Sequence, residues 1–187
     1  MPTKIKITKE MLINAAFDIV REEGFERLST RVLAEKVGCS TQPIFSNFSN
    51  FEELCKVVIE LAHKKYLDTI NEVISQNKYP EYKASGIAYV KFASEEKNLF
   101  KLLFMNESAK KYLSGEKSWS DSVEYIKDNI TLSKAKAELF HLEMWTVVHG
   151  LAVMCVTSYC DISEDLVSVI LSDVYNGLKS RVEVKND

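Results

Sequence analysis

The feature that most limits the fold is the spacing of apolar residues along a chain that has very few helix breakers. Apolar side chains return every three or four positions over most of the 187 residues, and only 6 glycines and 3 prolines interrupt them. This spacing puts apolar groups on one face of an α-helix, and no stretch shows the alternation typical of a strand. The sequence therefore predicts an all-α fold of about nine helices.

Four helices with defined ends are predicted in the first part of the chain. Short polar residues, which accept hydrogen bonds from free N–H groups, stand where these helices should begin. Gly24 suits the left-handed conformation that often ends a helix, and Gly38 breaks the second helix. The predicted helices, with their capping residues, are 8–23 (Thr8), 30–37 (Ser29), 41–47 (Ser40) and 51–77 (Asn50 with Glu53).

The helices predicted after Pro80 are more apolar. Residues 134–158 are apolar nearly all round after Leu139, which predicts a helix buried on several sides. The last helix, capped by Asp161 with Glu164 or by Ser163, has one apolar stripe, formed by Leu166, Val169, Ile170, Val174 and Leu178. The predicted helices of this part are 82–93, 95–104, 120–130, 134–158 and a last one that ends near Arg181.

The second and third predicted helices have the spacing of a helix-turn-helix. Ala34 is small enough for a helix crossing, Gly38 permits the turn, and Ile44 can fill the core between the helices. The outward residues of this motif are mostly short and polar, and such residues can reach base edges in a major groove or nearby phosphates. The candidate DNA-binding residues are Thr30, Arg31, Ser40, Thr41, Gln42, Phe45, Ser46, Asn47 and Ser49.

The net charge of the chain does not favour DNA binding. The net charge is −3, and residues 1–51 contain seven Lys and Arg against six Asp and Glu. A basic surface is the usual sign of a nucleic-acid-binding protein, so long-range attraction to DNA should be weak. Any affinity for DNA must then come from local geometry and from the pairing of two subunits.

The remaining composition predicts a cytoplasmic protein without a membrane span. The chain opens with no signal peptide, and the apolar stretch 144–156 is short and contains His149 and Gly150. Four cysteines follow no CxxC spacing, which favours buried, reduced thiols over a metal or redox site. These cysteines are Cys39, Cys55, Cys155 and Cys160.

The segment AAFDIVREEGFERLSTRVLAEKVGCSTQPIFSNFSNFEEL, residues 15–54, resembles the TetR family of transcriptional regulators. The matching pieces keep their spacing without a gap. Further on, WTVVHGLAVM (145–154) and FASEEKNLFKLLF (92–104) are similar to one C-terminal subgroup of that family. The matching pieces of the first segment are Ala15-Ala16, Gly24-Phe25, Leu33-Ala34, Val37-Gly38, Ser40, Ile44-Phe45, Phe48 and Glu52-Glu53-Leu54.

The resemblance implies a helix-turn-helix DNA-binding domain over 1–50 and a helical ligand-binding and dimerisation domain over 51–187. It implies a homodimer joined through the last two helices of each subunit and a near-palindromic operator in double-stranded DNA. Members of the family usually act as repressors. The resemblance also implies that ligand binding shifts the fourth helix and so changes the spacing of the two helices that read the DNA. The alternative is a helix-turn-helix fold that binds a protein partner.

Four positions depart from the family pattern. The family usually has Tyr at position 45, His at 47 and Lys at 51, where this chain has Phe45, Asn47 and Phe51. Neither phenylalanine can donate a hydrogen bond to a phosphate. Pro43 also replaces a common Thr. Phe45 is expected either to pack beneath its helix or to contact a sugar or a thymine methyl group.

Aromatic and methionine side chains at helical spacing are candidates for a ligand pocket, although such residues also form ordinary core. An apolar lining predicts a hydrophobic or aromatic effector. Trp145 and His149 share a helix face, either as core or on the wall of a pocket or dimer interface. The candidate pocket residues are Phe92, Phe100, Phe104, Met105, Met144, Trp145 and His149.

No motif in the sequence indicates catalysis. There is no GxSxG elbow, P-loop or dinucleotide fingerprint, and the chain is predicted to need no cofactor. The three histidines are His63, His141 and His149, and Glu143 is the one Cys or carboxylate at a recognised metal-ligand spacing from them. Glu143 is expected to point elsewhere, so no metal site is predicted. An all-α enzyme is therefore a remote alternative.

Overall fold

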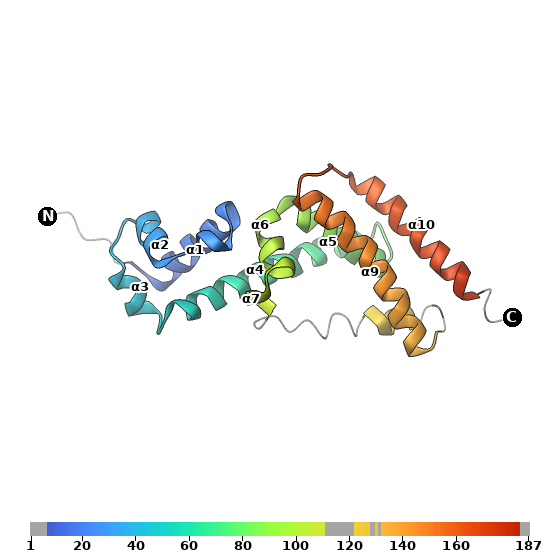
Figure 1. Cartoon of the computed structure of the whole chain (residues 1–187), viewed down its shortest axis with the longest axis horizontal. Coiled ribbons are helices and arrows are strands. Elements are labelled where there is room, and N and C mark those ends of the chain that lie inside the picture. Colours follow the sequence, from blue (N-terminus) through green and yellow to red (C-terminus); the bar gives the residue numbers. More distant parts are fainter. Residues whose placement is uncertain (1–6, 111–121, 128–129, 131, 184–187) are drawn as a thin grey trace. The chain divides into compact units, whose positions relative to one another are not determined.

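The structure is a computed structural model that describes residues 7–110, 122–127, 130 and 132–183 (Figure 1). All of the secondary structure in these ranges is helical, with nine α-helices of defined bounds, two short segments of other helix types and a helical stretch over residues 122–127. This finding confirms the predicted all-α fold. The predicted helix over 120–130 is described only in part, and residues 122–127 are helical.

The chain forms two compact units that interleave in sequence. The described residues of Met1–Lys65 and Glu96–Leu113 belong to the first unit, and those of Tyr66–Glu95 and Ser114–Asp187 belong to the second. Compactness alone does not show which residues bind DNA or a ligand, so the functional division at residue 50 stays a prediction.

The first unit begins with three helices around a small apolar core. Helix α1 (Lys9–Glu23) packs against α2 (Thr30–Val37) and α3 (Gln42–Asn47), and a 3-10 turn, η1 (Phe25–Arg27), follows α1. The core takes its largest side chains from the buried faces of these helices. Its fully buried members include Leu12, Ala16, Ile19, Val20, Leu33 and Ile44.

The ends of α1 follow the sequence signals with one difference. The Thr8 hydroxyl accepts a hydrogen bond of 3.2 Å from the Met11 N–H, as its capping position predicts. Gly24 lies at φ 96° and ψ 160°, so the predicted left-handed helical conformation is wrong at this residue. The positive φ at Gly24 still favours glycine, which has no Cβ to clash in this conformation. This conformation lets the chain turn directly from α1 into η1.

Later elements also belong to the first unit. The predicted helix 95–104 is wrong in detail, since a short α6 (Lys97–Phe100) gives way to a π-helical segment, η2 (Lys101–Met105), before α7 (Glu107–Lys110). Helix α6 packs on α1. The long α4 (Phe51–Ser75) starts in this unit and runs on into the second.

The second unit is built on three mutually packed helices. Helix α5 (Glu81–Glu95) packs on α9 (Lys134–Val156) and on α10 (Glu164–Glu183), which also contact each other. A Cβ atom at Gly86 would lie 3.1 Å from Leu171 Cδ1, so glycine permits the close approach of α5 and α10. Ser163 caps α10 by accepting a hydrogen bond of 3.3 Å from the Leu166 N–H, which confirms one of the two predicted caps.

The burial of α9 and α10 corrects two predictions. Helix α9 is long and apolar enough to cross a membrane by composition, yet its inner side packs on α5 and α10. The predicted burial on several sides is wrong, because the buried residues of α9 recur at the spacing of one helix face while Leu139, Leu142 and Met154 are exposed. On α10 the buried residues include Val167 and Leu171, whereas the predicted stripe is half-buried or exposed. Its exposed members are Leu166 and Val169.

The cysteines are free, as predicted, but their burial differs from the prediction. Cys155 alone is buried, and Cys39, Cys55 and Cys160 are half-buried.

Candidate nucleic-acid interface

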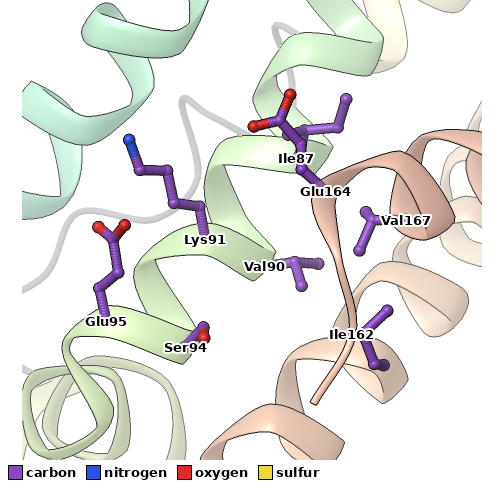
Figure 2. Close-up of a pocket in the computed structure, with 8 residues that line it drawn as sticks. All are labelled: Ile87, Val90, Lys91, Ser94, Glu95, Ile162, Glu164 and Val167. Carbon is purple, nitrogen blue, oxygen red and sulfur yellow. The ribbon is translucent and has the colours of Figure 1, made fainter.

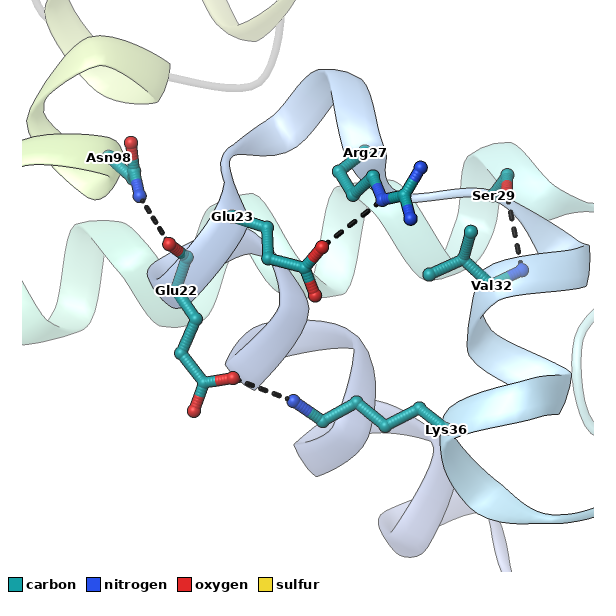
Figure 3. A network of polar contacts seen from close by, with 7 residues as sticks. All are labelled: Glu22, Glu23, Arg27, Ser29, Val32, Lys36 and Asn98. Carbon is teal, nitrogen blue, oxygen red and sulfur yellow. Dashed lines mark hydrogen bonds and ion pairs between the residues drawn. The ribbon is translucent and has the colours of Figure 1, made fainter.

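The turn between α2 and α3 is fixed by hydrogen bonds at both ends of α2. The Ser29 hydroxyl accepts a bond of 3.3 Å from the Val32 N–H at the start of the helix (Figure 3). At the end, Gly38 adopts φ 72° and ψ 37°, which is the left-handed region. The Cys39 N–H then reaches back 2.9 Å to the Ala34 carbonyl. This arrangement closes α2 and directs the chain into α3.

Helix α3 begins one residue later than predicted. Thr41 stands at the N-cap and its side chain makes no capping hydrogen bond, so the predicted cap at Ser40 is wrong. Pro43 lies in the first turn, where its missing N–H has no helical partner to lose. Ile44 is fully buried and Phe48 nearly so, and these two residues fix which side of α3 faces the core.

The candidate DNA-binding residues lie on the outside of this motif. Their exposure is compatible with contact to another molecule, and it leaves the assignment to DNA a prediction. Thr30 and Asn47 are half-buried. The exposed candidates are Arg31, Ser40, Thr41, Gln42, Phe45, Ser46 and Ser49.

Two polar side chains of α3 bond to their own helix. The Ser46 hydroxyl donates to the Gln42 carbonyl at 3.0 Å, and the Asn47 amide donates to the Pro43 carbonyl at 2.8 Å. Phe45, by contrast, is 58% exposed. The expectation that Phe45 packs beneath its helix is therefore wrong, and contact with a partner molecule is the alternative that stays open.

The start of α4 is held by a capping box that also ties it to α1. The Glu53 N–H donates to the Asn50 side chain at 2.8 Å, as predicted, while the Glu53 carboxylate accepts from the Ser49 N–H at 2.7 Å. Lys9 of α1 lies 3.0 Å from the same carboxylate. The Ser49 N–H and then Lys9 lower the pKa of Glu53 to about 2. These bonds fix the loop between α3 and α4.

A polar contact between α1 and α6 was not predicted. Arg21 Nε and Nη2 donate to the two Glu96 oxygens at 2.7 and 2.6 Å, and the Glu96 side chain is only 6% exposed. The Asn98 amide donates to the Arg21 carbonyl at 3.0 Å and to the Glu22 carbonyl at 3.0 Å, and Figure 3 shows the second of these bonds. Asn98 thereby satisfies two carbonyls that the end of α1 leaves free. No local pattern could reveal partners about 75 positions apart.

The candidate pocket residues are divided between the two units. Phe100 is fully buried and lies 4.9 Å, centroid to centroid, from half-buried Phe104, whereas Met105 is exposed. These three belong to the first unit. The other four belong to the second unit: Phe92 and Met144 are buried, and Trp145 and His149 are half-buried.

An aromatic cluster joins α5 to α9 in the second unit. The Tyr89 hydroxyl lies 3.0 Å from His149 Nδ1, and the Trp145 ring stacks on His149 with centroids 5.8 Å apart. A second pair, Tyr82 and His141, repeats the contact at 2.9 Å. Burial lowers the pKa of both histidines and raises that of both tyrosines, so all four are neutral near pH 7. Both histidines are thus hydrogen-bonded, His141 as a buried residue and His149 as a half-buried one.

A recess of about 210 Å³ opens at the surface of the second unit (Figure 2). Its apolar wall comes from α5, from α10 and from Ile162 just before α10. The charged residues Lys91, Glu95 and Glu164 stand around it. Lys91 bonds Glu72 at 2.9 Å and Glu164 bonds Lys78 at 2.8 Å, so two of the three charges are paired. None of the candidate pocket residues lines this recess. Among the described residues, no group of His, Cys, Asp and Glu could hold a metal ion.

Comparison with known proteins identifies the fold. The sequence matches no family model, and a search among curated proteins finds no significant relative. Among solved structures, a TetR-like transcriptional regulator from Rhodococcus sp. RHA1 aligns with a TM-score of 0.64 at 14% identity, over 91% of this chain and 96% of the other.

Two further structures align over most of both chains. The multidrug binding protein EbrR, complexed with imidazole, aligns with a TM-score of 0.60 at 13% identity, covering 88% of this chain and 93% of its own. The fatty acid degradation regulator FadR from Bacillus halodurans aligns with a TM-score of 0.57 at 16% identity, covering 93% and 96%. The chain therefore has the fold of the TetR-like transcriptional regulators.

Proposed function

We propose that this chain is a DNA-binding transcriptional regulator of the TetR family that acts as a homodimer on a palindromic operator and responds to a small ligand. The observation that carries the proposal is the helix-turn-helix itself. Its turn is closed at Gly38, its inner side is fixed by Ile44, and most of its candidate DNA-binding residues are exposed. This is the arrangement that places a second helix in a major groove.

Gln42 is the best candidate for direct base contact. Its side chain is exposed on the first turn of α3, where an amide can reach a partner molecule. A glutamine amide can pair with both N6 and N7 of adenine. Arg31, exposed at the start of α2, is proposed to contact a phosphate together with the exposed hydroxyls of Ser40 and Ser49.

The proposed homodimer uses the outer side of α9 and α10. Leu142 on α9 and Val169 on α10 are exposed, along with other apolar residues of both helices. We propose that a partner covers the exposed apolar residues of these two helices, because large exposed apolar surfaces usually mark interaction sites. A Cβ atom at Gly150, two turns after Leu142, would meet nothing within 4 Å, which leaves room for a helix of the second subunit. Two reading helices related by a two-fold axis would match a palindrome.

The proposed effector is hydrophobic or aromatic and binds near the predicted pocket residues. The aromatic side chains of the second unit, including Trp145 and its neighbour Tyr89, favour such a ligand. Helix α4 offers a route from ligand to DNA, because it is continuous and has residues in both units. In this proposal the regulator is a cytoplasmic repressor that the ligand releases from DNA.

Selection of bound duplexes from a randomised DNA library tests the proposal. We expect a palindromic sequence to be enriched, since each subunit of a dimer reads one half-site. Gln42→Ala should then lower discrimination between the selected duplex and one altered at the contacted base pair by a factor equivalent to about 1–3 kcal/mol. An unchanged ratio for Gln42→Ala would remove the assigned base contact.

A protein partner for the helix-turn-helix is the second candidate function. The exposed ring of Phe45, with the even balance of charges in residues 1–51, is the observation that favours it. Salt separates the two functions, because DNA binding weakens steeply as counterions are released and a mixed protein interface does not. A selection that enriches no sequence would bring this candidate to the front.

A further inference from the structure

One large apolar side chain, Phe45, stands among polar residues on the outer side of α3. Fully buried Ile44 and nearly buried Phe48 mark the inner side of the helix, so Phe45 and Gln42 lie together on the outer side. Phe45 is the largest side chain there and is 58% exposed. Single exposed apolar residues are common, so the position of the ring, rather than its exposure alone, carries the argument.

The polar groups around Phe45 offer few hydrogen-bond donors to base edges. The Ser46 hydroxyl has one proton, and it donates this proton in a hydrogen bond of 3.0 Å to the Gln42 carbonyl. Asn47 is half-buried and donates to the Pro43 carbonyl at 2.8 Å. Pro43 has no polar side chain. Phe45 is therefore the side chain in the middle of α3 that offers apolar contact, beside two polar side chains that each donate to their own helix.

The C5-methyl group of thymine is the apolar group that base pairs present in the major groove. A phenylalanine ring fits against this methyl group and cannot donate a hydrogen bond to a phosphate. We propose that Phe45 is a specificity-determining residue that reads a thymine methyl group in each half-site. This inference rests on the proposed DNA-binding function and adds the base that the exposed ring selects.

The test changes single atoms of the DNA. A duplex obtained by selection is resynthesised with deoxyuridine in place of the conserved thymine, which removes the methyl group and keeps base pairing. Removal of one buried methyl group weakens binding about fourfold, so replacement in both half-sites should weaken binding about 15-fold. 5-Methylcytosine paired with guanine restores the methyl group and should bind more tightly than unmethylated cytosine at that position.

Protein variants assign the effect to Phe45. Phe45→Ala should bind the thymine duplex more weakly and should bind thymine and deoxyuridine duplexes within about twofold of each other. Phe45→Leu keeps an apolar side chain and should retain part of the preference. Leu67→Ala, at an exposed apolar position of α4, is the matched control and should keep the full preference. Circular-dichroism melting checks that each variant is folded.

Three results would overturn the inference: selected half-sites that share no thymine, deoxyuridine that binds as well as thymine, or a Phe45→Ala variant that keeps the full preference for thymine. If Phe45→Ala weakens every duplex equally, the ring contacts a sugar instead, and the regulator function stands without this inference. If selection enriches no duplex at all, the DNA-binding function fails as well, so the two failures are distinguishable.

Discussion

Arg21 and Glu96 form an ion pair in the first unit, and we expect the loss of Arg21 to destabilise that unit more than the loss of the Glu96 charge. The Glu96 side chain is 6% exposed, whereas Arg21 is 51% exposed. Removal of Arg21 leaves a buried carboxylate without its partner, and such a change costs about 3–5 kcal/mol in a fully buried pair. Because water reaches the Arg21 side, we expect Arg21→Met to cost about 2–3 kcal/mol of unfolding free energy.

The partner variant and the double variant sharpen this prediction. Glu96→Gln removes the charge from the buried side and leaves an arginine that water can solvate, so we expect a cost of about 1 kcal/mol. The double variant Arg21→Met with Glu96→Leu buries no charge, and apolar replacement of both partners is often near neutral. It should therefore be more stable than Arg21→Met alone.

Urea unfolding measures these differences in unfolding free energy. It is done at one fixed protein concentration, because the stability of the proposed dimer would depend on concentration. The matched control is Arg27→Met, which breaks the exposed pair with Glu23, whose side chains are 62% and 46% exposed (Figure 3). We expect that control to stay within about 0.5 kcal/mol of the wild type. The reasoning is refuted if Arg21→Met costs no more than Arg27→Met, or if the double variant is the least stable of all.

Three further predictions use other parts of the structure. The folded-state pKa of Glu53, about 2, lies below its ordinary value of 4.5, so its stabilisation is present above pH 4.5 and disappears as the pH falls towards 2; acid unfolding of Glu53→Gln should lack this part of the transition. Leu142→Asp combined with Val169→Asp should give monomers in sedimentation velocity, and a dimer that persists would place the interface elsewhere. Arg31→Ala should weaken binding to all duplexes alike and make the salt slope shallower by about one for each phosphate that the variant no longer neutralises, whereas a change in sequence preference would assign Arg31 to a base.

Local features of the fold could be predicted because their signals lie within three or four residues. Thr8, Ser29 and the Asn50–Glu53 pair cap the helices that they were expected to cap. Gly38 is left-handed because a turn into α3 needs a positive φ there. Such signals depend on short-range backbone geometry, which the sequence encodes directly.

Features that depend on tertiary packing could not be predicted. The sequence pattern of α10 shows an apolar stripe but not which side of the helix meets α5, and the buried residues prove to include Val167 and Leu171. The contact of Glu96 with Arg21 joins residues about 75 positions apart. The exposure of Phe45 likewise depends on how α3 packs, so both alternatives were open from sequence alone.

The most direct test of the central claim is a fluorescence-anisotropy titration with the intergenic DNA beside the gene of this protein. The titration is made at two salt concentrations, with an unrelated duplex as the control. We predict two chains per site, a clear preference for the native duplex, and an affinity that falls with a log–log salt slope of about −5 or steeper, as expected for six or more phosphate contacts. Equal, weak and salt-independent binding to both duplexes would contradict the account of this chain as a DNA-binding regulator.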